Sequence, residues 1–276
     1  MTEPTYDTLR FERRGRVGWL HLSRPEKLNA FTIAMWRELR DLGGRVGDDP
    51  DLRAVVVIGE GRAFSSGIDT SVFTDDRSGA SPLDEAPGRH PDPTVAAILA
   101  TQDAYTWLAD APYPTIAAVR GYALGAGLQL ALACDLRVVA RGAQLGLLEH
   151  RYGILPDLGG TQRLPRLVGP AKALQLIVTA ARIDTDEANR IGLVDVVVDD
   201  ADLEEAAAAL ADTIAAQPPL AVRGAKRAVQ AAASGLSVAE GLVVEAEAQA
   251  VCLRSADMGE AIAAFVERRP PDYRGA

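Results

Sequence analysis

Apolar positions in the first third of the chain alternate between strand-like and helix-like spacing. Residues 16–22 alternate in polarity and predict an early strand, which the residues SRP at 23–25 end. Residues 32–46 carry apolar side chains at helical spacing, with Thr32 placed to cap the helix. Residues 54–58 form an apolar, mostly β-branched run typical of a strand that is buried on both faces. Strands separated by helices predict an α/β fold.

The later sequence continues this alternation and then becomes helical. A helix over residues 94–109 is expected, and further strands are expected at 115–119, 138–139 and 194–198. From Leu203 onward the chain is Ala-rich, and its breaks predict four amphipathic helices near 201–217, 220–234, 237–253 and 256–267. We therefore expect a body over 1–200 and a helical region over 201–276 that serves as a lid or docks subunits.

A segment of about twenty residues, 74–93, has no periodicity and contains several Pro and Gly residues. Loops of this length inside a compact domain are usually functional or disordered. Two interpretations stay open: a mobile cover over an active site, or a plain surface insertion.

Composition narrows the class of protein. The 276 residues are 48% hydrophobic and 24% charged, enough for one sizeable core. The formal charge of −9 disfavours nucleic acid and anionic membranes as partners, so an anionic ligand would need a local basic cluster or helix N-termini. Cys134 and Cys252 have no metal or redox spacing and predict buried side chains in a reducing compartment. The start lacks the features of a signal peptide. We expect a cytoplasmic protein.

Two glycine-rich turns each follow a predicted strand. The first, GRAFSSGID over 61–69, has small residues around Gly67 that allow a ligand to approach the backbone. The second, GYALGAG over 121–127, leads into a helix, so its free N–H groups and the positive end of the helix dipole face whatever lies in front. Each turn alone more often serves packing. Neither has the pattern of a Walker or dinucleotide-binding loop.

Two carboxylates follow the second turn. Glu149 comes after the apolar run LGLL, and Asp157 lies eight residues later, after Pro156. A carboxyl group beside apolar side chains has a raised pKa, which suits general acid–base chemistry. Alternatively both are surface or helix-capping acids, and this alternative is strongest for Asp157. No Ser/His/Asp set and no metal-ligand spacing is visible, so no metal is predicted.

Five segments in this order resemble the enoyl-CoA hydratase/isomerase family, also called the crotonase superfamily. They are residues 24–30 (RPEKLNA), 63–69, 121–135, 159–164 and 264–269 (AFVERR). The resemblance implies a crotonase-like spiral of ββα units with a C-terminal helical region that assembles trimers, often paired into hexamers. It also implies an acyl-CoA substrate and no cofactor beyond the coenzyme A (CoA) moiety of that substrate.

The resemblance also implies roles for individual residues. The N–H groups of Ile68 and Ala126 form the oxyanion hole, and Glu149 and Asp157 are the candidate catalytic acids. Arg268 is the basic residue for CoA phosphates, including those on a neighbouring subunit. The other expected substrate or CoA contacts are Lys27, Leu28, Ala63, Ser65, Gly67, Asp69, Gly125 and Gln129.

One position departs from the family's hydratase pattern. Hydratases of the family usually carry glutamates at the positions of Gln129 and Glu149, and an amide cannot exchange a proton with substrate. Family isomerases use a glutamate at 149, alone or paired with an aspartate at 157. We therefore favour double-bond isomerisation. Hydration of a 2-enoyl-CoA by Glu149, with Gln129 or Asp157 placing the water, is the first alternative, and a non-catalytic acyl-CoA binder is the second.

Overall fold

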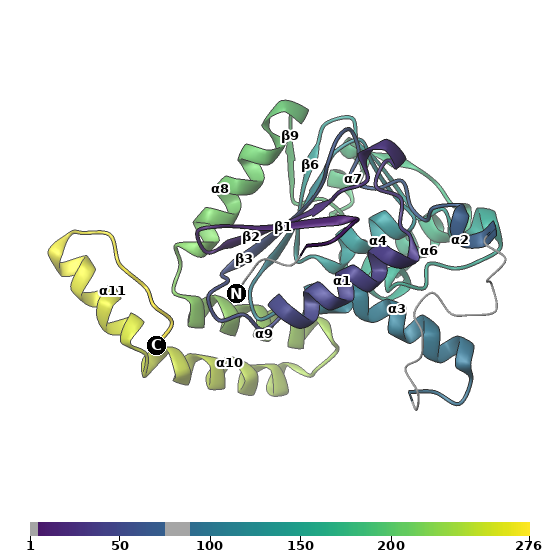
Figure 1. The fold of residues 1–276 in the computed structure, drawn as a ribbon. Coiled ribbons are helices and arrows are strands. Elements are labelled where there is room, and N and C mark those ends of the chain that lie inside the picture. Colours follow the sequence, from purple (N-terminus) through teal and green to yellow (C-terminus); the bar gives the residue numbers. More distant parts are fainter. Residues whose placement is uncertain (1–4, 75–88) are drawn as a thin grey trace.

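The fold is built around a six-stranded sheet (Figure 1). The computed structural model describes residues 5–74 and 89–276. The sheet has the order β1-β2-β3-β4-β6-β9; its first pair is antiparallel and the other neighbours are parallel. Its strands are β1 (Leu9–Arg14), β2 (Val17–Leu22), β3 (Ala54–Gly59), β4 (Thr115–Val119), β6 (Leu136–Ala140) and β9 (Val196–Val198).

A smaller sheet gives the chain its spiral course. It consists of β5 (Tyr122–Leu124), β7 (Gln144–Gly146) and β8 (Ile183–Asp184), in that order. β4 in the large sheet is followed by β5 in the small sheet and then by helix α4 (Ala126–Ala133). β6 and β7 repeat this step before helix α5 (Gly160–Val168). The expected spiral of ββα units is therefore present, and its two strand-to-helix transitions lie side by side.

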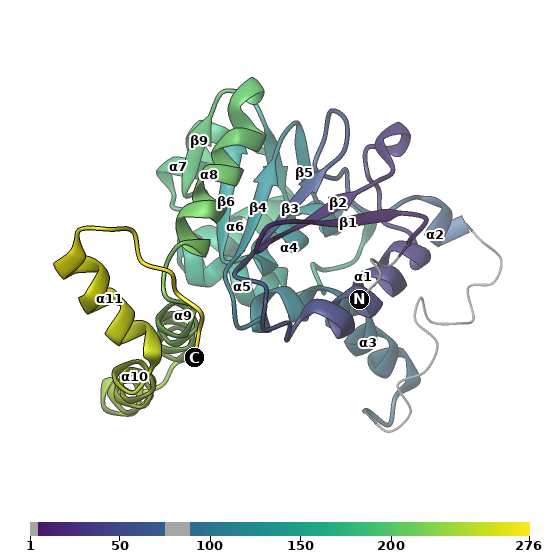
Figure 2. The same cartoon turned by 60° about the vertical axis from the view of Figure 1, so that its left-hand side comes forward.

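Helices cover both faces of the large sheet (Figures 1 and 2). Helix α8 (Leu203–Ala215) packs on one face, where Leu203, Ala207 and Ala211 are buried against strand residues that include Trp19 and Val56. The main core lies on the other face, among α1 (Ile33–Val46), α3 (Pro93–Asp110) and α4. The remaining elements are α2 (Ser71–Thr74), α6 (Pro170–Thr179), α7 (Thr185–Arg190) and the 3₁₀ turns η1 (Pro25–Lys27), η2 (Glu149–Tyr152) and η3 (Asp200–Asp202).

Three further helices extend from this body. They are α9 (Pro219–Ala233), α10 (Val238–Leu253) and α11 (Ala256–Glu267), and α10 and α11 project away from the sheets in both views (Figures 1 and 2). Helix α10 has no buried residue, and Phe265 on α11 is 85% exposed. The expected helical C-terminal region is present, although its first helix, α8, packs on the sheet, and a boundary at residue 201 stays a prediction. A role of this region in assembly stays a prediction.

Most predicted elements are confirmed within one to three residues. Thr32 caps α1 as expected, because its hydroxyl accepts a hydrogen bond from the N–H of Met35 at 3.3 Å. The sequence reading did not anticipate β1, the three short strands of the small sheet, α6 or α7. The core of the segment expected over 74–93, residues 75–88, lies outside the described residues. None of the helices in the described part of the chain has the length and apolar character that a membrane crossing requires.

Candidate active site

The two glycine-rich turns are joined to each other by backbone hydrogen bonds. The N–H of Ser65 donates to the carbonyl of Tyr122 at 2.8 Å, and the N–H of Leu124 donates to the carbonyl of Ser65 at 3.0 Å. Gly127, in the first turn of α4, sits so close that an added methyl group would lie 2.7 Å from Ser65 Cβ. The start of α4 is thus fixed against the first turn.

Each turn presents one backbone N–H that no acceptor within the described residues occupies. Phe31 bridges the first turn by donating to Gly67 and accepting from Asp69, so the N–H of Ile68 points away from Phe31. Ala126 is the first residue of α4, where N–H groups have no partner inside the helix. Neither Ile68 N nor Ala126 N donates a hydrogen bond to a described residue.

Gly67, Gly125 and Glu149 converge on one point. A methyl group added to Gly125 would lie 3.4 Å from Glu149 Oε1 and 3.8 Å from Gly67 Cα. These two glycines directly precede Ile68 and Ala126, so both free N–H groups lie next to the carboxylate. Gly67 has φ +107° and Gly125 has φ +52°, conformations that side chains rarely adopt, which explains the glycines.

Glu149 faces this point from a buried position at the start of η2. The residue is 5% exposed. Its Oε1 accepts a hydrogen bond from Gln129 Nε2 at 2.8 Å, and its Oε2 is buried without a partner among the described residues. Burial raises the pKa of the Glu149 carboxyl, although the hydrogen bond from Gln129 acts in the opposite direction. The arrangement leaves one carboxylate oxygen available for proton transfer.

Gln129 and the loop with Asp157 form the wall behind Glu149. Gln129 is 1% exposed, and its Oε1 accepts from the N–H groups of Leu158 at 2.8 Å and Gly160 at 3.0 Å. Asp157 is partly buried, and burial raises the pKa of its carboxyl. Its negative charge also contributes to the raised pKa of Glu149. The two acids therefore lie within electrostatic range of each other.

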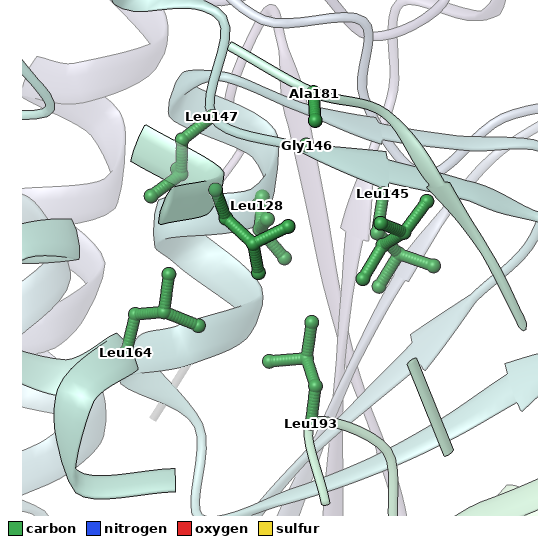
Figure 3. Close-up of a pocket in the computed structure, with 9 residues that line it drawn as sticks. Leu128, Leu145, Gly146, Leu147, Leu164, Ala181 and Leu193 are labelled. Carbon is green, nitrogen blue, oxygen red and sulfur yellow. The ribbon is translucent and has the colours of Figure 1, made fainter. Parts of the chain in front are cut away.

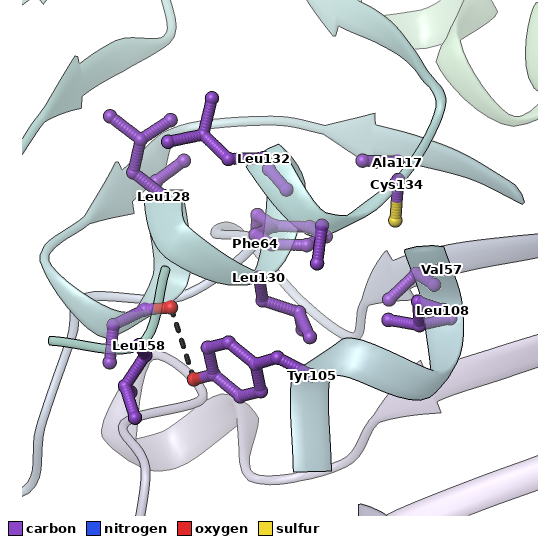
Figure 4. Packing of buried hydrophobic residues seen from close by; sticks show 14 of the residues in the cluster. Val57, Phe64, Tyr105, Leu108, Ala117, Leu128, Leu130, Leu132, Cys134 and Leu158 are labelled. Carbon is purple, nitrogen blue, oxygen red and sulfur yellow. Dashed lines mark hydrogen bonds between the residues drawn. The ribbon is translucent and has the colours of Figure 1, made fainter. Parts of the chain in front are cut away.

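Helix α3 supplies two site residues that the sequence reading did not identify. Gln102 Nε2 donates to the carbonyl of Asp157 at 2.6 Å. The buried Tyr105 hydroxyl donates to the carbonyl of Ala126 at 3.1 Å, the bond drawn as a dashed line in Figure 4. Both residues stand in the mostly apolar helix α3, outside the two glycine-rich turns. The only available signal was their polar groups on the helix face that packs inward.

The segment with Lys27 and Leu28 borders the first turn. Buried Asn29 fixes this arrangement, because its amide donates to the carbonyls of Glu60 at 2.9 Å and Ala63 at 2.8 Å. Lys27 is exposed, Leu28 is partly exposed and Ala63 is fully buried. A ligand on this surface would therefore contact the side chains of Lys27 and Leu28 but not that of Ala63. Contact of these residues with CoA stays a prediction.

Ser65 and Asp69 shape the first turn. Ser65 Oγ donates to the carbonyl of Asn29 at 2.8 Å and accepts from the N–H of Gly67 at 3.2 Å. Asp69 forms an ion pair with Arg24 at 3.0 Å. The backbone N–H of Ser71, together with Arg24, holds the pKa of the Asp69 carboxyl below its usual range. Both side chains hold the backbone that carries the N–H of Ile68.

Arg268 lies at the end of α11, outside this group. It is exposed and caps the helix with φ +55°. In both views α11 is at the opposite end of the molecule from α2, and α4 lies between them (Figures 1 and 2). Among the site residues expected from sequence, Arg268 alone is remote from the two turns of its own chain.

A small apolar cavity lies behind α4 (Figure 3). Leu128 of α4 faces Leu145, Leu164 and Leu193 across it, and its volume is about 10 Å³. This is about the space of one water molecule, and the lining is entirely apolar. The cavity therefore offers no substrate site, and the leucines around it fix α4 from the side opposite Ser65.

The chain is similar to known proteins over nearly its whole length. The chain matches the enoyl-CoA hydratase/isomerase family over residues 12–276. It is 38% identical over 271 residues to a protein named probable enoyl-CoA hydratase from Mycobacterium bovis, covering 98% of each chain. It is similar to the crystal structure of an enoyl-CoA hydratase from Bacillus anthracis, with a TM-score of 0.86 and 34% identity over 98% of this chain and 100% of that one.

A third relative was solved with a ligand. It is a Thermobifida fusca protein in complex with CoA, 39% identical, with a TM-score of 0.79 over 89% of this chain and 93% of that one. The family match and the structural similarities thus extend over the body, the two turns and the C-terminal helices. This protein therefore belongs to the enoyl-CoA hydratase/isomerase family of enzymes and has the crotonase fold.

Proposed function

We propose that this enzyme acts on enoyl-CoA thioesters and that its reaction is double-bond isomerisation through an enolate. The observation that carries the proposal is the position of Glu149, which is buried beside the two turns. Within the described residues, its Oε2 and the N–H groups of Ile68 and Ala126 have no hydrogen-bond partner. Two preorganised N–H donors suit a developing oxyanion, and each such donor contributes about 3 kcal/mol to lowering the barrier.

The proposed reaction starts from a 3-enoyl-CoA whose thioester oxygen lies between the N–H groups of Ile68 and Ala126. The Glu149 carboxylate removes a proton from C2, the C–H electron pair forms a C1–C2 double bond, and the carbonyl π pair moves to the oxygen to give a dienolate. The carbonyl then re-forms as the double bond moves to C2–C3. C4 receives a proton from Glu149 or from Asp157. Atoms are conserved, and the product is the 2-enoyl-CoA.

The surroundings of Gln129 favour this reaction over hydration. Water that adds to a double bond must transfer a proton to a base. An amide can accept a hydrogen bond from the water, but it cannot remove the proton. The Oε1 of Gln129 already accepts from Leu158 and Gly160, so it has little capacity left for a water molecule. Hydration by Glu149, with Asp157 or Gln129 placing the water, remains the second candidate, because the relatives from Mycobacterium bovis and Bacillus anthracis carry hydratase names.

Substrate assays in heavy water test the proposal. Purified protein is incubated with 3-enoyl-, 2-enoyl- and 3,5-dienoyl-CoA esters, and products are identified by mass spectrometry and NMR. Isomerisation moves the double bond and introduces deuterium without adding oxygen, whereas hydration gives a 3-hydroxyacyl-CoA. Formation of 3-hydroxyacyl-CoA without double-bond migration would show that the reaction is hydration and not isomerisation.

Glu149→Gln separates catalysis from binding. The amide cannot accept a proton, so turnover should fall by about 10²- to 10⁴-fold. Binding of a saturated acyl-CoA, measured by calorimetry, should stay nearly unchanged because the two N–H groups are retained. Glu205→Gln, an exposed position on α8, is the matched control. A wild-type protein that binds acyl-CoA but converts none of the three esters would be a non-catalytic binder.

The CoA moiety is proposed to lie along the exposed face of Lys27 and Leu28, beside the turn with Ala63, Ser65 and Asp69. Arg268 is proposed to contact the phosphates of CoA bound to a neighbouring subunit, since α11 projects away from the site of its own chain. Lys27→Ala and Arg268→Ala should then raise KM without changing kcat. An unchanged KM for both variants would exclude this placement.

Assembly into trimers, or pairs of trimers, is the second part of the proposal. Large apolar side chains stand exposed on the last two helices: Val238, Leu242, Val243, Val251, Leu253, Ile262, Phe265 and Val266. Apolar surface of this extent usually marks a protein–protein contact. Light scattering should give the mass of three or six chains, and Phe265→Asp should lower it, whereas Phe265→Leu should not. A monomeric wild-type protein would refute this assembly.

A further inference from the structure

We infer that Gln129 is a positioning residue, whose amide holds the Glu149 carboxylate with its nitrogen and the 157–160 loop with its oxygen. The inference deepens the proposed function and rests on it. It assigns the amide to an internal contact between two protein elements, instead of a contact with water or substrate.

The orientation of this amide is set by its neighbours. The N–H groups of Leu158 and Gly160 both point at Oε1, at 2.8 and 3.0 Å. A flipped amide would direct its own donors at these two N–H groups and leave them buried without an acceptor, at a cost of about 1–3 kcal/mol each. The amide nitrogen therefore has to face Glu149, whose Oε1 lies 2.8 Å from it.

The hydrogen bond from Gln129 determines which carboxylate oxygen of Glu149 is available for proton transfer. Oε1 is held by Gln129, and Oε2 is left buried without a partner among the described residues. Burial and the charge of Asp157 raise the pKa of Glu149, whereas the backbone N–H groups of Glu149 and Leu148 and the hydrogen bond from Gln129 lower it and so favour the charged form. On the surrounding helices, buried Tyr105 of α3 interacts electrostatically with both acids, and Arg163 of α5 interacts with Tyr105. The other charged side chains of these two helices, Asp103, Asp110 and Arg166, are partly or fully exposed. Gln129 thus helps to keep a buried acid in its basic form.

The Gln129 amide also fixes the position of Asp157 relative to Glu149. Leu158 follows Asp157 directly, so the bonds to Leu158 and Gly160 fix the loop that carries Asp157. Gln102 of α3 and Arg163 of α5 hold this loop from other sides, at the carbonyls of Asp157 and Leu158. Among the side chains that the structure describes, Gln129 alone is hydrogen-bonded both to this loop and to the Glu149 carboxylate. It therefore sets the separation between the proton acceptor and the second acid.

Three variants separate these contacts. Gln129→Met removes all three hydrogen bonds of the amide, to Glu149, Leu158 and Gly160, without adding charge. Gln129→Glu keeps an acceptor for Leu158 and Gly160 but replaces the donor to Glu149 by a negative charge. Gln102→Met loosens the same loop without touching Glu149, and is the matched control. The readouts are the ionisation of Glu149, followed by ¹³C NMR of glutamate-labelled free protein and assigned with Glu149→Gln, and the pH profile of kcat/KM.

Glu149 should titrate at higher pH in Gln129→Met than in the wild type, and at the highest pH in Gln129→Glu. The value of kcat/KM at pH 6 should fall by about ten- to a hundredfold in Gln129→Met, and the loss should shrink as the pH rises. Gln102→Met should lower kcat at every pH without moving the acidic limb. An unchanged Glu149 titration in Gln129→Met would overturn the inference. The titration needs no substrate, so failure of the proposed reaction would leave this test intact.

Discussion

Gly125 lies against the carboxylate of Glu149 so closely that a methyl group on the glycine would stand 3.4 Å from Oε1. The glycine caps α4 with φ +52° and ψ −122°, a conformation open almost only to glycine. The backbone conformation that exposes the N–H of Ala126 therefore selects glycine here, whereas a methyl group would only make van der Waals contact with the acid.

Gly125→Ala should harm activity and stability by different routes. The strained backbone should lower the free energy of unfolding by about 1–3 kcal/mol. If the backbone at position 125 relaxes, the N–H of Ala126 turns away from the position proposed for the oxyanion. The value of kcat should then fall by about a hundredfold. Gly142→Ala is the control, because Gly142 also has a positive φ, +85°, but has open space around it. Denaturant unfolding and kinetics should show lost stability in both variants and lost activity only in Gly125→Ala.

Asp157→Asn tests whether the second acid delivers the proton to C4. If it does, exchange of the C2 proton with deuterium should continue, because Glu149 is intact, while migration of the double bond should slow by about tenfold or more. NMR of the recovered 3-enoyl-CoA and its product measures both rates. Equal rates in wild type and variant would make Asp157 a structural residue, the alternative that the sequence left open.

The sequence predicted five of the six strands of the large sheet, all but β1, because their local signals agree with their environment. The run at 54–58 is apolar throughout, and β3 is buried on both faces. The small sheet was missed for the opposite reason. β5, β7 and β8 have two or three residues each, too few to show alternation, and their pairing depends on contacts far along the chain.

For the site, sequence reasoning identified the residue types but not their contacts. Glu149 follows an apolar run, so its burial was foreseeable, and the glycines of both turns marked the backbone that approaches it. The hydrogen bonds of Gln129 could not be foreseen, because they reach Leu158 and Gly160 across the fold. The same holds for Gln102, which lies 55 residues before the Asp157 carbonyl that it contacts.

Asp69→Asn should destabilise the protein in a pH-dependent way. The pKa of Asp69 is lowered in the folded state by the N–H of Ser71 and by Arg24, so its contribution is present above the ordinary carboxyl pKa and is lost as the pH falls. The variant should lose about 1–2 kcal/mol at pH 7 and progressively less below pH of about 4. Urea unfolding at both pH values measures this. Asp212→Asn, on the exposed surface of α8, should show no such trend.

Glu149→Gln should be more stable than the wild type at neutral pH, although it is inactive. Burial raises the pKa of Glu149 in the folded protein, so its charged form costs stability as the pH rises through that pKa. Glutamine keeps an acceptor for Gln129 Nε2 and carries no charge. Thermal unfolding should show a gain of roughly a few degrees at pH 8 that vanishes near pH 4, where Glu149 is protonated. Glu205→Gln should show no gain. A variant less stable than the wild type at pH 8 would mean that the ionised carboxylate contributes to folding, contrary to its free Oε2.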